Sequence, residues 1–134
     1  MPIPKRSTAA LRAVTVLAAI VATLVVWAVE APLLRIELRA RPPGAAPEIV
    51  GPAAIIVATL LAGLAAWGLL AVLERVTSQA RTVWIIVAVA ALLASLTLPL
   101  GGGVTVAAAV GLTCMHLTAA AVLIPLLART VVRH

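Results

Sequence analysis

The stretch LTCMHLTAAAVLIPLL, Leu112 to Leu127, is apolar almost throughout and holds one imidazole, His116, near its middle. It belongs to an apolar block of about residues 104–127, and crossing a hydrocarbon core of about 30 Å takes roughly 20 helical residues. Because the bilayer interior has no water to pair with backbone amides, such a block must satisfy its own N–H and C=O groups by coiling. The stretch therefore predicts a transmembrane helix.

Three further blocks of the same kind precede it, at about residues 9–29, 52–73 and 83–98. None shows the period-2 alternation expected of a membrane barrel strand. The sequence therefore predicts an all-α membrane protein, in which residues 1–134 form a single domain: an antiparallel bundle of four transmembrane helices.

The composition of the chain agrees with this class. Of its 134 residues, 64% are hydrophobic and 10% are charged, whereas about a quarter of the residues of a soluble protein are charged. The formal net charge of +6 comes from basic residues in short clusters between the blocks, and no Phe or Tyr is available to stack on bases. We therefore expect the lipid bilayer, and not a nucleic acid, as the partner.

The basic residues also predict an orientation. Three of them, Arg35, Arg39 and Arg41, lie in the segment 30–51, and seven lie on the other side of the apolar blocks: Lys5, Arg6, Arg12, Arg75, Arg81, Arg129 and Arg133. We expect the protein in the inner membrane of the cell. By the positive-inside rule, both termini should lie in the cytoplasm and the segment 30–51 should be extracellular. The first block exceeds the apolar run of a typical signal peptide, so we expect it to remain as a helix.

The three connections between the blocks differ in character. From Leu34 to Arg41 apolar and charged residues alternate, and a turn sequence, PPG, follows them. This pattern predicts a short β-hairpin cap, with residues 47–51 as the returning strand, and a solvated charged loop is the alternative. ERVTSQAR is expected to be a short turn in which Glu74 and Arg75 are ordinary boundary charges. PLGGG is expected to break the chain tightly after residue 98.

Small and aromatic residues predict how the helices pack. Ala54, Ala58, Ala62 and Ala66 recur every four residues, with Gly51 and Gly63 nearby, and this spacing is typical of a seam where two membrane helices approach closely. Trp27 and Trp84 are expected at the two membrane interfaces, and Trp67 inside the bundle. The single cysteine, Cys114, allows no internal disulfide and is expected to be a small packing residue.

Two ionisable residues of the blocks are candidate site residues. His116 is expected near the midplane, either as a buried ring bonded to Thr113, Ser95 or Thr97, or as a proton relay, general base or ligand contact. Glu30 ends the first block and is expected to pair with Arg35 or to form part of an outer site. Helical rise separates Glu30 from His116 by most of half a bilayer, so a direct acid–base pair between them is only a hypothesis.

Two classes of function follow from these residues. The first is a non-enzymatic accessory, interaction or hydrophobic-ligand-binding bundle, whose partners are a hydrophobic small molecule, a membrane protein or a second copy in a homo-oligomer. Its candidate ligand contacts are Trp67, Thr113, Ser95, Thr97 and Trp27. The second is a membrane-embedded enzyme, of isomerase or cyclase type, that acts on a lipophilic substrate through His116 and Glu30. A cavity that His116 lines and that reaches Glu30 would favour the enzyme.

Familiar catalytic motifs are missing from the sequence. It contains no H-E-x-x-H, no Walker A loop, no G-x-S-x-G elbow and no Asp, and His134 is the only other histidine. We therefore expect neither a metal site nor a cofactor.

Four segments carry a resemblance to a known family: LVVWAVEAPLL, LLAGLAAWGLLAVLER, VWIIVAVAALLASLTLPL and MHLTAAAVLIPLLART. Together they resemble an uncharacterised family, with a domain-of-unknown-function label, of small four-helix integral membrane proteins from actinobacteria. The resemblance spans nearly the whole chain. It implies four helices, an inner membrane location and an actinobacterial origin, and it implies no activity, cofactor or site residue.

Overall fold

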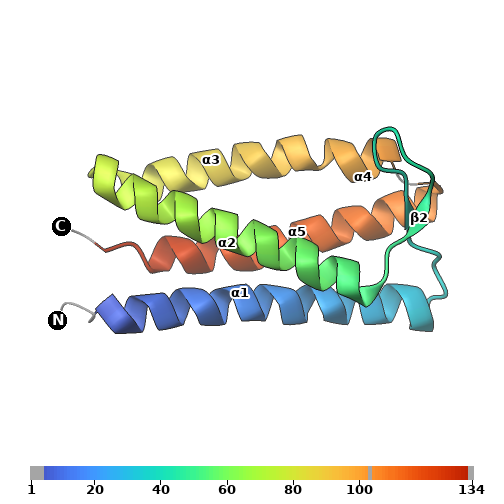
Figure 1. Cartoon of the computed structure of the whole chain (residues 1–134), viewed down its shortest axis with the longest axis horizontal. Coiled ribbons are helices and arrows are strands. Elements are labelled where there is room, and N and C mark those ends of the chain that lie inside the picture. The colour runs from blue at the N-terminus through green and yellow to red at the C-terminus, as the bar shows by residue number, and fades with distance from the viewer. Residues whose placement is uncertain (1–4, 103, 133–134) are drawn as a thin grey trace.

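The computed structural model describes residues 5–102 and 104–132, and it consists mostly of long helices (Figure 1). The predicted number of long apolar helices is confirmed, because four helical stretches are long and apolar enough to cross a membrane. Their bounds are Ser7–Leu33, Pro52–Val76, Ala80–Gly102 and Val106–Arg129. Together with their apolar composition, these four stretches suggest a membrane protein.

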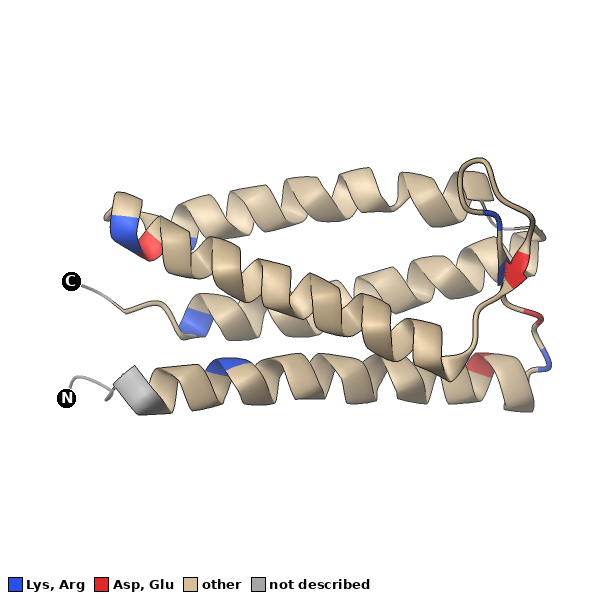
Figure 2. Ribbon diagram, viewed as in Figure 1, with Lys and Arg blue, Asp and Glu red and all other residues tan. Residues whose placement is uncertain are grey.

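The bundle has two distinct ends. Helix α1 (Lys5–Ala28) begins where α5 (Val106–Arg129) ends, and we call this the terminal end. At the opposite end, the hairpin end, a small sheet connects α1 to α2 (Pro52–Val76). Lys, Arg and Glu gather at these two ends and leave the middle of every helix free of charge (Figure 2). Arg133, one of the basic residues behind the predicted orientation, and the second histidine, His134, lie outside the described residues.

The first helix is longer than predicted. After Ala28 it continues as a π-helix, η1 (Val29–Leu33), which contains Pro32. A proline has no backbone N–H to donate, and the wider turn is closed by the N–H of Leu34, which donates to Val29 O at 2.9 Å. The charged residue Glu30 is thereby carried on the helix instead of in the loop after it.

The break expected at PLGGG is wrong, because the third span stays helical through most of this segment, to Gly102. Helix α3 (Ala80–Ser95) is followed after one residue by α4 (Thr97–Gly102). The two are bridged by backbone hydrogen bonds from Leu96 N to Leu92 O and from Leu100 N to Leu96 O. Pro99 lies in the first turn of α4, where an N–H has no partner within the helix, so it does not end the span.

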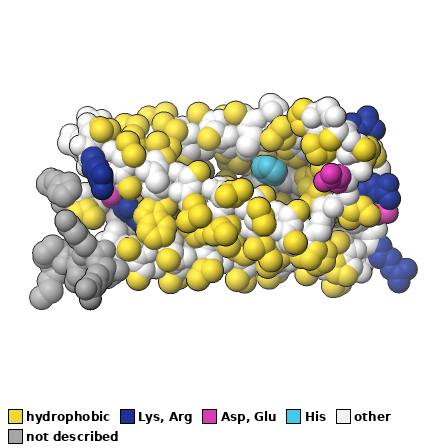
Figure 3. Space-filling view, in the orientation of Figure 1, with side chains coloured by type: hydrophobic (Ala, Val, Ile, Leu, Met, Phe, Trp, Pro, Cys, Tyr) yellow, Lys and Arg dark blue, Asp and Glu magenta, His cyan; other side chains and the backbone are white. Residues whose placement is uncertain are grey.

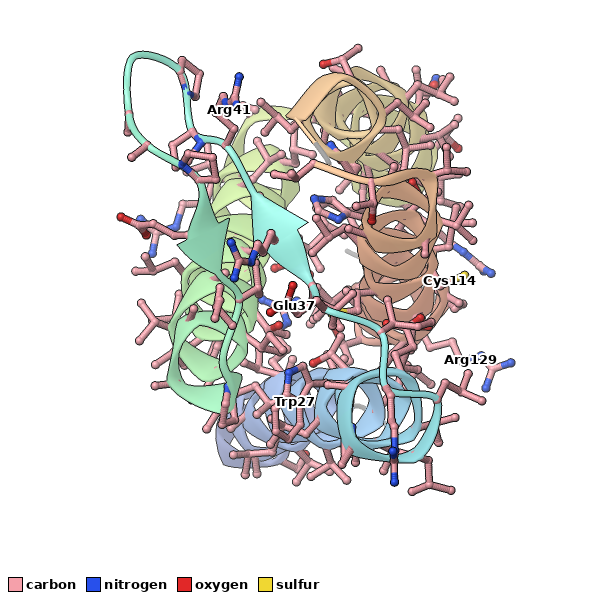
Figure 4. The ribbon with its side chains drawn as sticks, turned by 90° about the vertical axis from the view of Figure 1, so that its right-hand side faces the viewer. Trp27, Glu37, Arg41, Cys114 and Arg129 are labelled. Atoms are coloured by element: carbon pink, nitrogen blue, oxygen red, sulfur yellow. The ribbon has the colours of Figure 1, made fainter. Side chains whose placement is uncertain are left out.

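The predicted hairpin is confirmed in a shorter form. Strand β1 (Arg39–Ala40) pairs antiparallel with β2 (Glu48–Ile49), in the register Arg39 to Ile49 and Ala40 to Glu48. The residues between Leu34 and Leu38 are not strand. β1 is also tied to the segment between α4 and α5, since Arg41 N donates to Gly102 O at 2.8 Å and Val104 N donates to Arg39 O at 3.2 Å. The hairpin thus lies across the mouth of the bundle (Figure 4).

The core is divided between the two ends. At the terminal end the buried cluster contains Val16, Ala19, Leu70, Trp84, Leu123, Leu127 and Ala128. At the hairpin end it contains Leu38, Ile55 and Met115. Trp84 is 3% exposed and donates from Nε1 to Ile124 O at 3.1 Å. Near the start of α3, the indole thus packs inside the bundle and has its hydrogen-bond partner on α5.

Candidate functional site

A groove opens between α2 and α3, and α5 forms its floor. In Figure 1 α2 runs obliquely, close to α3 at the terminal end and close to α1 at the hairpin end. The cavity left where α2 and α3 diverge has a volume of about 390 Å³ and is lined by α2 residues 62–69, α3 residues 84–95 and α5 residues 116–124. We call it the α2–α3 groove. Figure 3 shows a histidine side chain in this hollow, and His116 is the histidine of the described residues.

A second cavity lies farther along the same face of α2, toward the hairpin end. It measures about 250 Å³ and is lined by residues of α1, α2 and α5, together with Val50. We call it the α1–α2 groove. Three residues, Ala62, His116 and Ala119, line both grooves, so the two cavities meet at the imidazole.

The alanine repeat of α2 lines these cavities. Ala54, Ala58 and Ala62 line the α1–α2 groove, and Ala62 and Ala66 line the α2–α3 groove. The prediction of a close helix–helix seam along these four residues is therefore wrong. α1 and α2 approach closely at Gly63, where an added Cβ would lie 2.7 Å from Val16 Cγ1. The alanines are too short to fill the space on either side of that contact.

His116 is half-buried, and its ring has one hydrogen bond. Nδ1 lies 2.8 Å from Leu112 O, one turn earlier on α5. A carbonyl oxygen only accepts, so Nδ1 carries a proton, and in the neutral tautomer of this kind Nε2 is an acceptor. His116 is the eleventh residue of α5, which at 1.5 Å per residue places it about 15 Å from the helix start, near the middle of a helix about 36 Å long.

The hydroxyl groups proposed as partners of His116 donate instead to backbone carbonyls three or four residues earlier in the chain. Thr113 donates to Ala109 O at 2.7 Å, and Thr97 donates to Ala94 O at 2.7 Å from an exposed position. Ser95 donates to Leu92 O at 2.8 Å. Of these three residues only Ser95 lines the α2–α3 groove with His116.

The tryptophans proposed as ligand contacts lie outside both grooves. Trp67 is half-buried on α2 and lines neither cavity. Trp27 donates from Nε1 to Val50 O at 3.2 Å, which ties α1 to the residue just before α2. The tryptophan that does line the α2–α3 groove is Trp84. Cys114, expected in the packing, is exposed and points away from the bundle (Figure 4).

Glu30 lies apart from His116. It is 8% exposed on η1, and its Oε2 is buried without a hydrogen-bond partner among the described residues. The carboxylate occupies the space left by Gly111, since a Cβ there would lie 3.0 Å from Oε2. Arg35 is exposed and forms no ion pair with Glu30, so that predicted pair is wrong. Glu30 lines neither groove, and the hypothetical contact with His116 is not formed.

A buried polar cluster at the terminal end was not predicted. Arg12, 4% exposed, donates to Glu74 Oε1 at 2.6 Å and to Thr130 Oγ1 at 2.9 Å. Glu74 Oε1 also accepts from Val132 N at 3.1 Å. Glu74 is therefore not an ordinary boundary charge. The sequence signal was Arg12 itself, a guanidinium inside an apolar block, which needs a partner. Among the described residues no group of His, Cys, Asp or Glu is able to hold a metal ion.

A family model described as "Family of unknown function (DUF6069)" matches residues 3–133 of the chain. The match covers nearly the whole chain, so the protein belongs to this family. No curated protein and no solved structure matches the chain.

Proposed function

We propose that this member of DUF6069 is an integral membrane protein that binds a lipophilic small molecule in the α2–α3 groove, without catalysing a reaction. The observation that carries the proposal is a cavity of about 390 Å³ that is lined almost entirely by apolar side chains and has one imidazole at midspan. Binding sites for small molecules have volumes of about 300–1,000 Å³ and combine apolar walls with a few polar groups.

The location of the groove supports a ligand that enters from lipid. The groove opens on the side of the bundle, between two helices long enough to cross a membrane. A ligand dissolved in the hydrocarbon would reach it without crossing the charged ends. Lipid chains and apolar side chains are equally hydrophobic, so a ligand gains little by leaving the lipid for an apolar wall. Its affinity therefore has to come from the close fit of its shape to the groove and from a polar contact. His116 supplies that contact.

The proposal includes an orientation. We propose an inner-membrane protein with both termini in the cytoplasm, supported by the excess of basic residues at the terminal end. Reporter fusions at residue 134 and within the segment 42–47 test this: an alkaline phosphatase should be active only in the segment, and a fluorescent protein should fluoresce only at residue 134. The reverse pattern would refute the orientation. An actinobacterial source is part of the same proposal and rests on the resemblance alone.

The alternative, an acid–base enzyme that uses His116 with Glu30, has less support. Leu38 and Gly111 enclose the carboxyl group of Glu30, which lines neither groove. A general acid or base must come within hydrogen-bond reach of the atom whose proton it moves. A substrate held in the α2–α3 groove would meet the imidazole but not the carboxylate.

Fluorescence of Trp84 tests the binding proposal. In a variant that keeps Trp84 alone (Trp27→Phe, Trp67→Phe), bromine quenches the indole that lines the groove. We expect a terminally brominated hexadecanol, or its methyl ether, to quench saturably in lipid nanodiscs. Filling the groove with Ala119→Leu should abolish the saturable part.

A matched substitution on the same helix provides the control. Ala121 is exposed and lines neither groove, so Ala121→Leu should leave the quenching unchanged. Quenching that rises linearly with bromine content in all three proteins would mean that only bulk lipid touches the groove. That result would overturn the proposed function.

A further inference from the structure

The polar side chains that line the two grooves have their donors in use and acceptor capacity left open, and from this we infer that the ligand is a neutral lipophilic alcohol. Its hydroxyl group would donate to Nε2 of His116. This inference rests on the proposed function and specifies the chemistry of the molecule bound there.

The donors that line the α2–α3 groove are already used. Ser95 donates to Leu92 O, and the indole of Trp84 donates to Ile124 O. His116 donates from Nδ1 to Leu112 O. Each of these bonds closes on a backbone carbonyl of the bundle. What the groove leaves open is acceptor capacity: the lone pair of His116 Nε2 and the second lone pair of Ser95 Oγ.

The donors of the α1–α2 groove are used in the same way. Thr23 Oγ1 lies 2.9 Å from both Ala19 O and Ile20 O, so its proton is directed to those carbonyls. The hydroxyl of Thr59, 3.3 Å from Thr23 Oγ1, must therefore donate to Thr23. Each of the side-chain O–H and N–H groups named here, in either cavity, thus has an acceptor inside the protein.

An acceptor without a donor selects among lipid head groups. A ketone, ester, ether or quinone brings only acceptors, so it would leave the lone pair of Nε2 without a donor. A carboxylate or phosphate brings negative charge to a cavity that no Lys or Arg of the described residues lines. An ammonium group would need a carboxylate there, and none of the described residues in the lining supplies one. A hydroxyl group is neutral and supplies the missing proton.

The depth of His116 excludes ordinary phospholipids as the source of that hydroxyl. The imidazole lies about 15 Å along α5 from its start, near the middle of the span. A phospholipid head group stays at the interface because of its charge. A long-chain alcohol without a charged head is able to bring its oxygen to the midplane, where it has otherwise no partner. The ligand is thus a molecule dissolved wholly in the hydrocarbon, with one hydroxyl group.

A matched pair of probes tests the inference in the protein that keeps Trp84 alone. Brominated hexadecanol donates one hydrogen bond, and its methyl ether has the same chain, bromine and oxygen but no donor. We expect the alcohol to bind roughly three- to tenfold more tightly, the gain from one net hydrogen bond. In His116→Leu this preference should disappear while the ether still binds. Ser95→Ala, which keeps the imidazole, should retain the preference.

The possible outcomes separate the inference from the proposed function. If neither probe quenches saturably, the proposed function fails and this inference fails with it. If both probes bind equally in the protein with His116, the groove binds lipophiles but the selection for a donor is refuted. If His116→Leu prefers the alcohol as strongly as the protein with His116 does, the hydrogen bond to His116 is also refuted.

A second measurement covers the case in which His116→Leu does not fold. In protein with ¹⁵N-labelled imidazoles and the substitution His134→Ala, the Nε2 resonance of His116 should shift when the alcohol is added. The ether should leave it unchanged. A shift of Nδ1 alone, or no shift at saturating alcohol, would refute the hydrogen bond.

Discussion

The guanidinium of Arg12 lies 2.6 Å from the carboxylate of Glu74, a residue 62 positions later in the chain. Both side chains are shielded, at 5% and 13% exposure. Thr130, near the end of α5, accepts from the same guanidinium through its hydroxyl and its carbonyl. One arginine therefore joins α1, α2 and the end of α5, and it closes the terminal end of the bundle.

Removing one member of this ion pair should destabilise the protein strongly. Glu74→Met leaves the guanidinium buried and unpaired, and breaking a buried pair in this way costs about 3–5 kcal/mol. We expect a lower midpoint of thermal unfolding in detergent. Arg12→Met with Glu74→Met removes both charges and should recover much of the loss, because two apolar side chains need no partner.

A second ion pair in the same chain serves as the control. Arg39 and Glu37 lie 3.1 Å apart on the hairpin, at 43% and 69% exposure. An exposed pair contributes about 0–1 kcal/mol, so Glu37→Gln should change the unfolding midpoint little. Equal losses in Glu37→Gln and Glu74→Met would contradict the role given to burial.

Gly63 is predicted to tolerate no side chain. A Cβ at this residue would lie 2.7 and 2.9 Å from the two γ-carbons of Val16. Valine in a helix is nearly confined to one χ1 rotamer, so it has no easy way to move aside. Gly63→Ala should therefore destabilise the bundle by about 1–3 kcal/mol, measured by thermal unfolding.

Two variants show whether that contact is the cause. Val16→Ala removes both γ-carbons and should restore part of the stability of Gly63→Ala. Gly68, on the same helix, has nothing within 4 Å of its Cβ position. Gly68→Ala should be neutral or should stabilise the protein by up to about 1 kcal/mol, because alanine favours the helix. A loss at both glycines would point to backbone flexibility instead of packing.

The architecture could be predicted from the sequence because hydrocarbon leaves backbone amides few choices. Four apolar blocks, their approximate limits and a turn at PPG were enough to predict four long helices and a hairpin. The ends of the helices were harder to predict. Pro99, in PLGGG, suggested a break, but it lies where a helix needs no N–H, and a π-helical turn carries the first helix past Pro32.

The site was only partly predictable, because its shape depends on which helices diverge. The midspan position of His116 follows from its place in an apolar block. The alanine repeat signalled close packing, yet the tilt of α2 left those residues beside empty space. The pairing of Arg12 with Glu74 joins residues on different helices, and no local pattern records such a contact.

Glu30 is predicted to respond to substitution in the opposite way from Glu74. Its Oε2 is buried with no partner among the described residues, and an unsatisfied polar group of this kind costs about 1–3 kcal/mol. Glu30→Met has a similar length and needs no partner, so the unfolding midpoint should stay the same or rise by a few degrees. A fall comparable to that of Glu74→Met would mean that the carboxyl group has a stabilising partner.

Gly111 is predicted to control how firmly the hairpin is seated. A Cβ at this residue would lie 2.7 Å from Leu38 Cδ2, and Leu38, 2% exposed, directly precedes β1. Gly111→Ala should therefore push the hairpin outward, and faster amide exchange in residues 39–50 should measure this while the exchange of α2 and α3 stays slow. A Cβ at Gly101 would have nothing within 4 Å, so Gly101→Ala should leave the amide exchange of the hairpin and of the helices unchanged. If exchange instead quickens along all the helices, the contact supports the whole bundle and not the hairpin alone.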